Sequence, residues 1–339
     1  MKKIKVENAV GTVLAHDITR IVPGKFKGVG FKKGHVVTEE DVPGLLKLGK
    51  SSLYVLELSP DQLHEDQAAL RIAPAISGDN LKWTDPVEGK SNIVSIKDGL
   101  LKVNTAGLLR INKLGNIIIS TLRTNFPVKK GQTIAATRII PLTISRRKIE
   151  KLENLSERFK PILQVRPYRR MRVGGVVTGS EIYKGLINDE FDRYVAQKFI
   201  DYGCEYVRKI VVPDNADAIS RAILELKELG CELILATGGL SVDPDDVTRK
   251  GIRKAGARLI SYGSPILPGA MFLYALLNEI PILGLPACVY YYKATVYDLI
   301  LPRVLAGERI TKNDIAKMGH GGLCLNCENC RYPVCPFGK

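Results

Sequence analysis

The sequence predicts an α/β protein whose C-terminal half is built on a mostly parallel sheet. Between residues 172 and 307, short apolar segments typical of strands alternate regularly with helical segments. Strands that alternate with helices form a parallel sheet that is covered by helices on both faces. Residues 1–145 have a different pattern, with short β-branched runs separated by glycine turns. We therefore expect a β-rich α+β region to precede the parallel sheet.

We expect several domains, because 339 residues exceed what one hydrophobic core usually serves. A charged helical pattern followed by a basic segment with proline suggests a linker between the two halves. The expected divisions are a small α+β unit at 1–58, a β-rich domain at 59–145, a helix and linker at 146–171, the α/β domain at 172–307 and a cysteine-rich tail at 308–339.

Composition and charge restrict the classes of partner. The chain has 50 Lys and Arg against 35 Asp and Glu, a net charge of +15, which attracts polyanions or small phosphorylated ligands. The basic residues are scattered and carry no nucleic-acid-binding signature, so we do not expect nucleic acid as a partner. No apolar run approaches the roughly 20 residues of a membrane span, and Glu7 and Asn8 interrupt any signal-peptide core. We expect a cytoplasmic protein.

One segment, from Cys231 to Thr248, combines the features of a binding site. Its first half is an apolar strand that ends in the glycine turn Thr237-Gly238-Gly239. A glycine turn that leads into a helix exposes unpaired backbone N–H groups, which bind phosphate. Its second half carries three carboxylates, among them Asp246, and the hydroxyl of Ser241. These carboxylates would repel a phosphate unless a cation or a reacting centre lies between them.

The ends of the other predicted strands extend this site. Ligands of open parallel sheets bind beyond the carboxyl ends of the strands. Two further predicted strands end in turns, at Thr178-Gly179 and at Gly284-Leu285-Pro286. Asp189 begins the helix after the first of these strands, where a single carboxylate commonly only complements the helix dipole. Together with Asp246 it becomes a candidate to hold Mg²⁺ or to position a charged group near the phosphate.

Four of the seven cysteines crowd into the last sixteen residues with the spacing C-x2-C-x2-C-x4-C. In a chain expected in the cytoplasm, such a cluster indicates a metal rather than disulfides. The four thiolates would suit zinc or an iron–sulfur cluster, and the spacing does not choose between the two. A reduced, disordered tail is the alternative. The predicted metal ligands are Cys324, Cys327, Cys330 and Cys335.

Residues 172–307 contain, in order, the motifs TGSEI (178–182), GLIND (185–189), GCE (203–205), TGGLSVDPDDVT (237–248), LPGA (267–270) and GLP (284–286). In these motifs the chain resembles the molybdopterin-binding domain family. This family includes the molybdenum insertases, the molybdopterin adenylyltransferases and the N-terminal domain of the competence-damage-inducible proteins. The leading region and the tail look most like those of uncharacterised molybdopterin-binding proteins with the same Cys-rich end.

The resemblance implies a three-layer α/β fold that binds the phosphate of molybdopterin at the TGG turn. It also implies that Asp189 and Asp246 are catalytic residues, which hold Mg²⁺ and handle adenylylated molybdopterin or molybdate. The implied cofactor-binding residues are Thr178, Gly179, Glu181, Thr237, Gly238, Gly239, Ser241, Pro268, Gly269, Gly284, Leu285 and Pro286.

Two functions in molybdenum-cofactor metabolism follow from the resemblance. One is Mg²⁺-dependent insertion of molybdate into adenylylated molybdopterin. The other is a non-catalytic carrier, chaperone or sensor that binds the cofactor and docks to a molybdoenzyme through its tail. Ala270 and Cys288 favour the second function, because they stand where insertases have polar residues. A nucleotide pyrophosphatase or amidase is a third, weaker hypothesis, and a homo-oligomer is expected by analogy with the fold.

Overall fold

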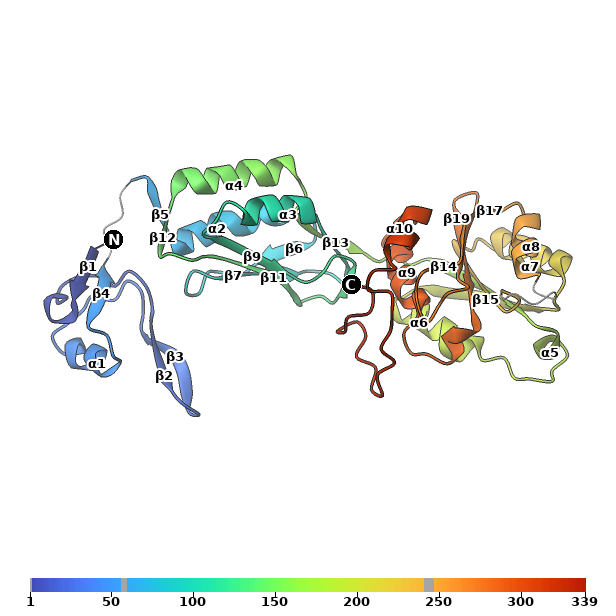
Figure 1. The fold of residues 1–339 in the computed structure, drawn as a ribbon, viewed down its shortest axis with the longest axis horizontal. Coiled ribbons are helices and arrows are strands. Elements are labelled where there is room, and N and C mark those ends of the chain that lie inside the picture. Colours follow the sequence, from blue (N-terminus) through green and yellow to red (C-terminus); the bar gives the residue numbers. More distant parts are fainter. Residues whose placement is uncertain (1, 56–59, 241–246) are drawn as a thin grey trace. The chain divides into compact units, whose positions relative to one another are not determined.

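The computed structural model describes residues 2–55, 60–240 and 247–339. The chain divides into two compact units, Met1–Arg166 and Pro167–Lys339 (Figure 1). No helix in the described ranges combines the length and the apolar character that a bilayer crossing needs.

The first unit is rich in strands. Its strands are β1 (Lys2–Lys5), β2 (Ile18–Val22), β3 (Phe26–Phe31), β4 (Ser52–Val55), β5 (Gln62–His64), β6 (Leu81–Trp83), β7 (Ser91–Ser95), β8 (Gly99–Val103), β9 (Ile117–Thr121), β10 (Phe126–Val128), β11 (Thr133–Ile139), β12 (Thr143–Ser145) and β13 (Leu163–Pro167). Its helices are the 3₁₀ turn η1 (Val6–Asn8), α1 (Asp41–Lys47), α2 (Glu65–Ile76), α3 (Thr105–Asn112) and α4 (Arg146–Arg158).

The largest sheet of this unit has the strand order β6-β7-β11-β9 and is antiparallel. Helices α2, α3 and α4 lie along one side of it (Figure 1). The segment 146–171 was expected to form a helix and linker, but Ile149 and Leu152 of α4 are fully buried in the core that α2 and the sheet share. These two residues form an apolar stripe on an otherwise charged helix, so α4 belongs to the body of the first unit.

The second unit contains the predicted alternation of strands and helices. Its strands are β14 (Arg172–Thr178), β15 (Glu205–Val212), β16 (Leu233–Thr237), β17 (Arg258–Tyr262), β18 (Leu273–Leu277) and β19 (Ile280–Leu285). Its helices are α5 (Ser180–Tyr183), the π-helical turn η2 (Asp192–Ala196), α6 (Gln197–Asp201), α7 (Ala216–Glu228), α8 (Thr248–Lys254), the 3₁₀ turn η3 (Ala287–Tyr290), α9 (Val296–Leu305) and α10 (Lys312–Lys317).

These strands form one sheet in the order β15-β14-β16-β19-β18-β17. The first four are mutually parallel, whereas β18 runs antiparallel to both β19 and β17. The predicted fold class, an α/β fold on a mostly parallel sheet, is confirmed. The antiparallel strands β17 and β18 were not predicted.

The sheet lies between two layers of helices. Helices α7 and α8 cover one face, and α6 and α9 cover the other (Figure 1). Two adjacent glycines of β14 let both layers approach closely. A Cβ on Gly174 would lie 2.8 Å from Leu226 of α7, and a Cβ on Gly175 would lie 2.6 Å from the ring of Phe191 on the opposite face. The pair of glycines therefore sets the thickness of the three-layer fold.

Candidate functional site

The three strand ends that the sequence singled out are neighbours in the sheet. Thr237 pairs with Val177 of β14 on one side and with Leu285 of β19 on the other. The turns that follow these strands therefore leave the same edge of the sheet, as predicted. In parallel sheets this edge is where ligands bind.

The turn after β16 requires glycine at two positions. Gly238 and Gly239 have φ values of 85° and 56°, in the left-handed region. A Cβ on Gly238 would lie 2.1 Å from the carbonyl oxygen of Thr178, and a Cβ on Gly239 would lie 2.6 Å from the hydroxyl oxygen of Thr248. The turn therefore packs backbone to backbone against the end of β14.

Thr248, at the start of α8, fixes this turn. Its hydroxyl donates to the carbonyl oxygen of Gly238 at 2.8 Å and lies 3.2 Å from the hydroxyl oxygen of Thr178. Its backbone N–H donates to the carbonyl oxygen of Gly239 at 3.2 Å. Both threonine side chains are buried. Thr178, predicted to contact the cofactor, thus uses its hydroxyl inside the protein, and Thr248 is a site residue that the prediction did not include.

The carboxylate of Asp214 binds Ser180, just beyond the end of β14. Its Oδ2 accepts hydrogen bonds from the backbone N–H of Ser180, at 2.8 Å, and from the hydroxyl of Ser180, at 3.1 Å. The neighbouring Glu181 is exposed. A carboxylate already bound here leaves the turn after β16 as the better place for an anionic group. Asp214 was not predicted, although it directly follows the Pro213 that ends the apolar run of β15.

Asp189 forms an ion pair with Lys209 of β15. Lys209 Nζ lies 2.5 Å from Asp189 Oδ2 and 2.6 Å from Asp192 Oδ2. Asp189 Oδ1 accepts a hydrogen bond from the backbone N–H of Phe191 at 2.9 Å. Burial lowers the pKa of Lys209, but its hydrogen bonds to the two carboxylates outweigh this effect and raise the pKa above its usual value. Lys209 was not predicted as a site residue.

Tyr290 lies near both this ion pair and Thr237, the last residue of β16. Burial raises the pKa of Tyr290 to about 12, and the side chain of Thr237 and the charges of Asp189 and Lys209 act on it as well. Thr237 is itself buried. The predicted residues Thr237 and Asp189 therefore share one neighbourhood, on the face of the sheet opposite to Thr248.

The described part of the site does not fit Mg²⁺ at Asp189. One carboxylate oxygen is held by a backbone N–H and the other by the Lys209 ammonium group, whereas Mg²⁺ needs oxygen ligands at about 2.0–2.1 Å. The predicted partner Asp246 and the predicted cofactor contact Ser241 lie outside the described residues.

The LPGA and GLP motifs come together in a second part of the site. Gly269 has a φ of 136° and packs against Val296, where a Cβ would lie 2.5 Å from a side-chain carbon. Val296 N–H donates to the carbonyl oxygen of Pro268 at 3.2 Å. Both motifs line one cavity of about 360 Å³ together with the tail. Its lining includes Pro268, Gly269, Ala270, Pro286, Cys288 and Cys324.

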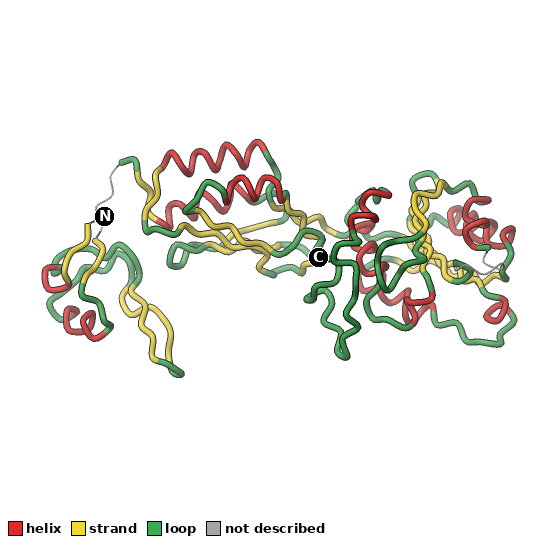
Figure 2. The backbone as a smooth tube through the Cα atoms, in the orientation of Figure 1, coloured by secondary structure: helices red, strands yellow, loops and turns green. Residues whose placement is uncertain are grey.

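The Cys-rich tail contains no helix or strand after α10 (Figure 2). A backbone hydrogen bond joins the beginning of this segment to its end. Gly338 N–H donates to the carbonyl oxygen of Gly321 at 2.8 Å, and Cys324 N–H donates to that of Leu267 at 2.8 Å. Phe337 is buried in the core of the second unit, and the hydroxyl of Tyr332 donates to the carbonyl oxygen of Asp298 at 2.8 Å. These contacts attach the tail to the second unit, and its four cysteines are free.

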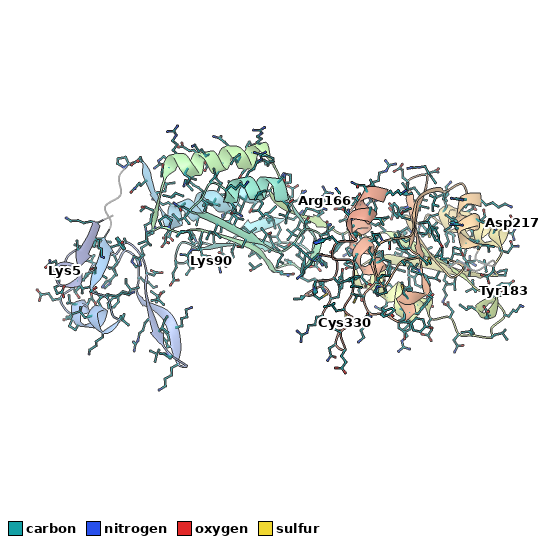
Figure 3. All side chains as sticks on the ribbon, in the orientation of Figure 1. Lys5, Lys90, Arg166, Tyr183, Asp217 and Cys330 are labelled. Atoms are coloured by element: carbon teal, nitrogen blue, oxygen red, sulfur yellow. The ribbon has the colours of Figure 1, made fainter. Side chains whose placement is uncertain are left out.

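All four cysteines of the tail line one cavity of about 250 Å³. Cys324 and Cys335 are half-buried, whereas Cys327 and Cys330 are exposed. Figure 3 marks the position of Cys330 in the tail. Across the ranges that the structure describes, no three His, Cys, Asp or Glu side chains are gathered closely enough to hold a metal ion. The predicted ligands thus surround one cavity without forming a metal centre.

Two family models match parts of this chain. Residues 174–306 match the family model described as "Probable molybdopterin binding domain". Residues 3–57 match a model described only as a domain of unknown function. The first match spans all three strand ends of the candidate site.

Curated relatives match over short stretches. A CinA-like protein of Fervidobacterium nodosum is 32% identical over 118 residues, which cover 34% of this chain and 25% of the relative. A molybdopterin molybdenumtransferase of Haemophilus influenzae is 27% identical over 158 residues, 44% of this chain and 38% of the relative. The chain thus spans well under half the length of these relatives. Among solved structures, the molybdopterin biosynthesis enzyme MoaB of Thermus thermophilus is 19% identical, with a TM-score of 0.35, over 41% of this chain and 98% of that chain.

Proposed function

We propose that this chain, whose residues 174–306 belong to the molybdopterin-binding domain family, binds molybdopterin with its phosphate at the turn after β16. The observation that carries the proposal is the construction of this turn. Gly238 and Gly239 hold left-handed conformations, and the hydroxyl of Thr248 fixes the carbonyl of Gly238 from the interior. A turn whose carbonyls are bound inside the protein keeps its N–H groups for an anion.

The rest of the ligand would lie along the same edge of the sheet. The cavity that Pro268, Gly269 and Pro286 line offers an apolar surface beside the turn after β19. The thiol of Cys288, which also lines the cavity, is neutral at physiological pH, because burial raises its pKa to about 11. This cavity therefore suits the uncharged ring system of a pterin better than it suits a second anionic group.

Between the two functions in cofactor biosynthesis, the geometry favours the carrier, chaperone or sensor over the Mg²⁺-dependent insertase. Asp189, the implied catalytic residue, is already bound to Lys209 and to a backbone N–H. Ala270, which lines the cavity, has no polar group to offer a substrate. The insertase remains the second candidate through Asp246.

One experiment tests both candidates. The full chain is mixed first with molybdopterin and then with adenylylated molybdopterin, molybdate and Mg²⁺, and both binding and AMP release are measured. A carrier binds molybdopterin and releases no more AMP than buffer. AMP release that depends on Asp246 would establish the insertase, and failure to bind either pterin would overturn the proposed function.

We further propose that the tail takes up a thiophilic metal, either zinc or iron as an iron–sulfur cluster. Uptake requires the exposed Cys327 and Cys330 to approach Cys324 and Cys335 across the cavity that all four line. Titrating the reduced chain with Co²⁺ should give the strong charge-transfer absorbance of thiolate ligands. Cys327→Ser should abolish this absorbance, whereas Cys204→Ser, at a buried cysteine outside the tail, should retain it. Visible absorbance after anaerobic purification distinguishes a cluster from zinc.

A further inference from the structure

We infer that Lys209 is the resident cation of the site and that it excludes divalent metal ions from Asp189. Its ammonium nitrogen lies 2.5 Å from Asp189 Oδ2 and 2.6 Å from Asp192 Oδ2, so it bridges two carboxylates. Only 13% of the Asp189 side chain and 20% of the Lys209 side chain are exposed. The pair is thus largely removed from water. An interaction between charges is stronger in such an environment than at the protein surface.

The sheet register fixes the position of Lys209. Lys209 pairs with Gly175 of the neighbouring parallel strand, so both positions face the same side of the sheet. Gly175 leaves this side open for the ring of Phe191, which is fully buried there. The backbone N–H of Phe191 in turn holds Asp189 Oδ1. The ion pair is therefore positioned by the core and does not depend on a surface loop.

Each carboxylate oxygen of Asp189 and Asp192 already has a partner, an N–H or O–H donor or the Lys209 ammonium group. The hydroxyl of Tyr206 donates to Asp192 Oδ1 at 2.6 Å, and Lys209 binds the other oxygen of Asp192. Burial raises the pKa of Asp192, but these two hydrogen bonds outweigh it and lower the pKa, so the carboxylate is held in its charged form. A divalent ion at Asp189 would have to displace the lysine that both carboxylates bind. If the ion bound beside this lysine instead, the two cations would repel each other.

This inference goes beyond the proposed function, because it concerns cation selectivity rather than pterin binding. The related insertase chemistry implies Mg²⁺ at the position of Asp189, and this chain fills the place of the metal with its own lysine. Any Mg²⁺ that the protein binds should therefore be independent of Asp189.

The test uses Mn²⁺ as the probe and measures the free ion by electron paramagnetic resonance during titration of the full chain. Asp189→Asn should bind as much Mn²⁺ as the wild type, because the carboxylate is not a metal ligand. Lys209→Gln should bind about one further Mn²⁺ per chain, since it leaves two carboxylates without their cation. The double variant with Asp189→Asn should lose this gain.

A matched control is available in the same unit. Lys198 binds both oxygens of Asp298, at 2.7 and 2.8 Å, with a similar 24% side-chain exposure. Lys198→Gln removes a lysine from a single carboxylate and should gain no Mn²⁺ site. A loss of Mn²⁺ binding in Asp189→Asn, or no gain in a folded Lys209→Gln, would overturn the inference. Because molybdopterin is absent from this titration, its outcome is independent of the proposed function.

Discussion

The hydroxyl of Thr248 donates to the carbonyl oxygen of Gly238 at 2.8 Å and so ties the start of α8 to the glycine turn after β16. Both ends of this bond lie against the buried end of β14, where Thr178 completes the contact. The turn is therefore held from the interior of the protein, through the contacts that Thr248 makes with its carbonyl groups. Changes at Thr248 should alter the site without touching the ligand.

Thr248→Val should weaken molybdopterin binding and destabilise the second unit. The substitution keeps the shape of the side chain but leaves the carbonyl of Gly238 without its partner, which costs about 1–3 kcal/mol. Binding affinity and chemical denaturation measure the two effects. Thr248→Ser retains the hydroxyl and should stay close to the wild type in affinity. A loss in Thr248→Ser without a loss in Thr248→Val would show that the methyl group, and not the hydrogen bond, holds the turn.

Gly238→Ala should abolish binding at the turn, because its Cβ would lie 2.1 Å from a backbone oxygen that cannot move aside. Gly256→Ala is the matched control. Gly256 has a similar φ of 88°, but its Cβ would meet nothing closer than 3.9 Å. Each variant bears the strain of a left-handed alanine, about 1–2 kcal/mol, so Gly256→Ala controls for this strain. Comparable affinity in the two would contradict the assigned role of the turn.

The sequence was sufficient to predict the parallel sheet and the meeting of its three strand ends. Both follow from local patterns, since an apolar run before a glycine turn marks the end of a buried strand, and parallel strands align these ends. The contact between Lys209 and Asp189 could not be predicted in this way. It depends on the register that sets Lys209 opposite Gly175, and no local pattern encodes the pairing of two strands.

The tail and α4 show a second limit of local patterns. The cysteine spacing predicted a metal centre, but the structure anchors the tail by Phe337, a residue to which no motif drew attention. In α4, a charged sequence concealed the buried Ile149 and Leu152. Burial of single apolar residues is decided by tertiary packing, which a one-dimensional pattern does not contain.

The stability of the protein should fall steeply above about pH 10. Burial raises the pKa of Tyr290 to about 12 and that of Tyr297 well above its usual value. Tyrosines of the unfolded chain ionise near pH 10, so above this pH the unfolded state binds fewer protons than the folded state. Each such tyrosine contributes stability that is complete below about pH 10 and is lost as the pH rises through the folded pKa, at about 1.4 kcal/mol per pH unit.

Phenolate absorbance in the near ultraviolet checks this prediction. The folded chain should ionise fewer tyrosines than the denatured chain between about pH 10 and pH 12. Tyr290→Phe should reduce the pH dependence of the unfolding free energy in this range by the contribution of one tyrosine. Identical titrations of the folded and denatured chains would refute the assigned burial.

Arg303→Met should destabilise the second unit by about 3–5 kcal/mol, because it leaves the largely buried carboxylate of Glu308 and the partly buried carboxylate of Asp314 without their cation. Arg303 is 7% exposed, and it binds Glu308 at 2.7 Å and Asp314 at 3.3 Å, which connects α9 to α10 at the start of the tail. Arg208→Met removes an ion pair whose side chains are 58% and 46% exposed, and it should cost at most about 1 kcal/mol.

Chemical denaturation can assign this loss to the correct unit. The chain has one tryptophan, Trp83, which lies in β6 of the first unit. Tryptophan fluorescence therefore follows the first unit, whereas tyrosine signals in near-ultraviolet circular dichroism include the buried Tyr274 and Tyr297 of the second. Arg303→Met should shift the tyrosine transition to lower denaturant and leave the tryptophan transition in place. A shift of the tryptophan transition alone would contradict the assignment of Arg303 to the core of the second unit.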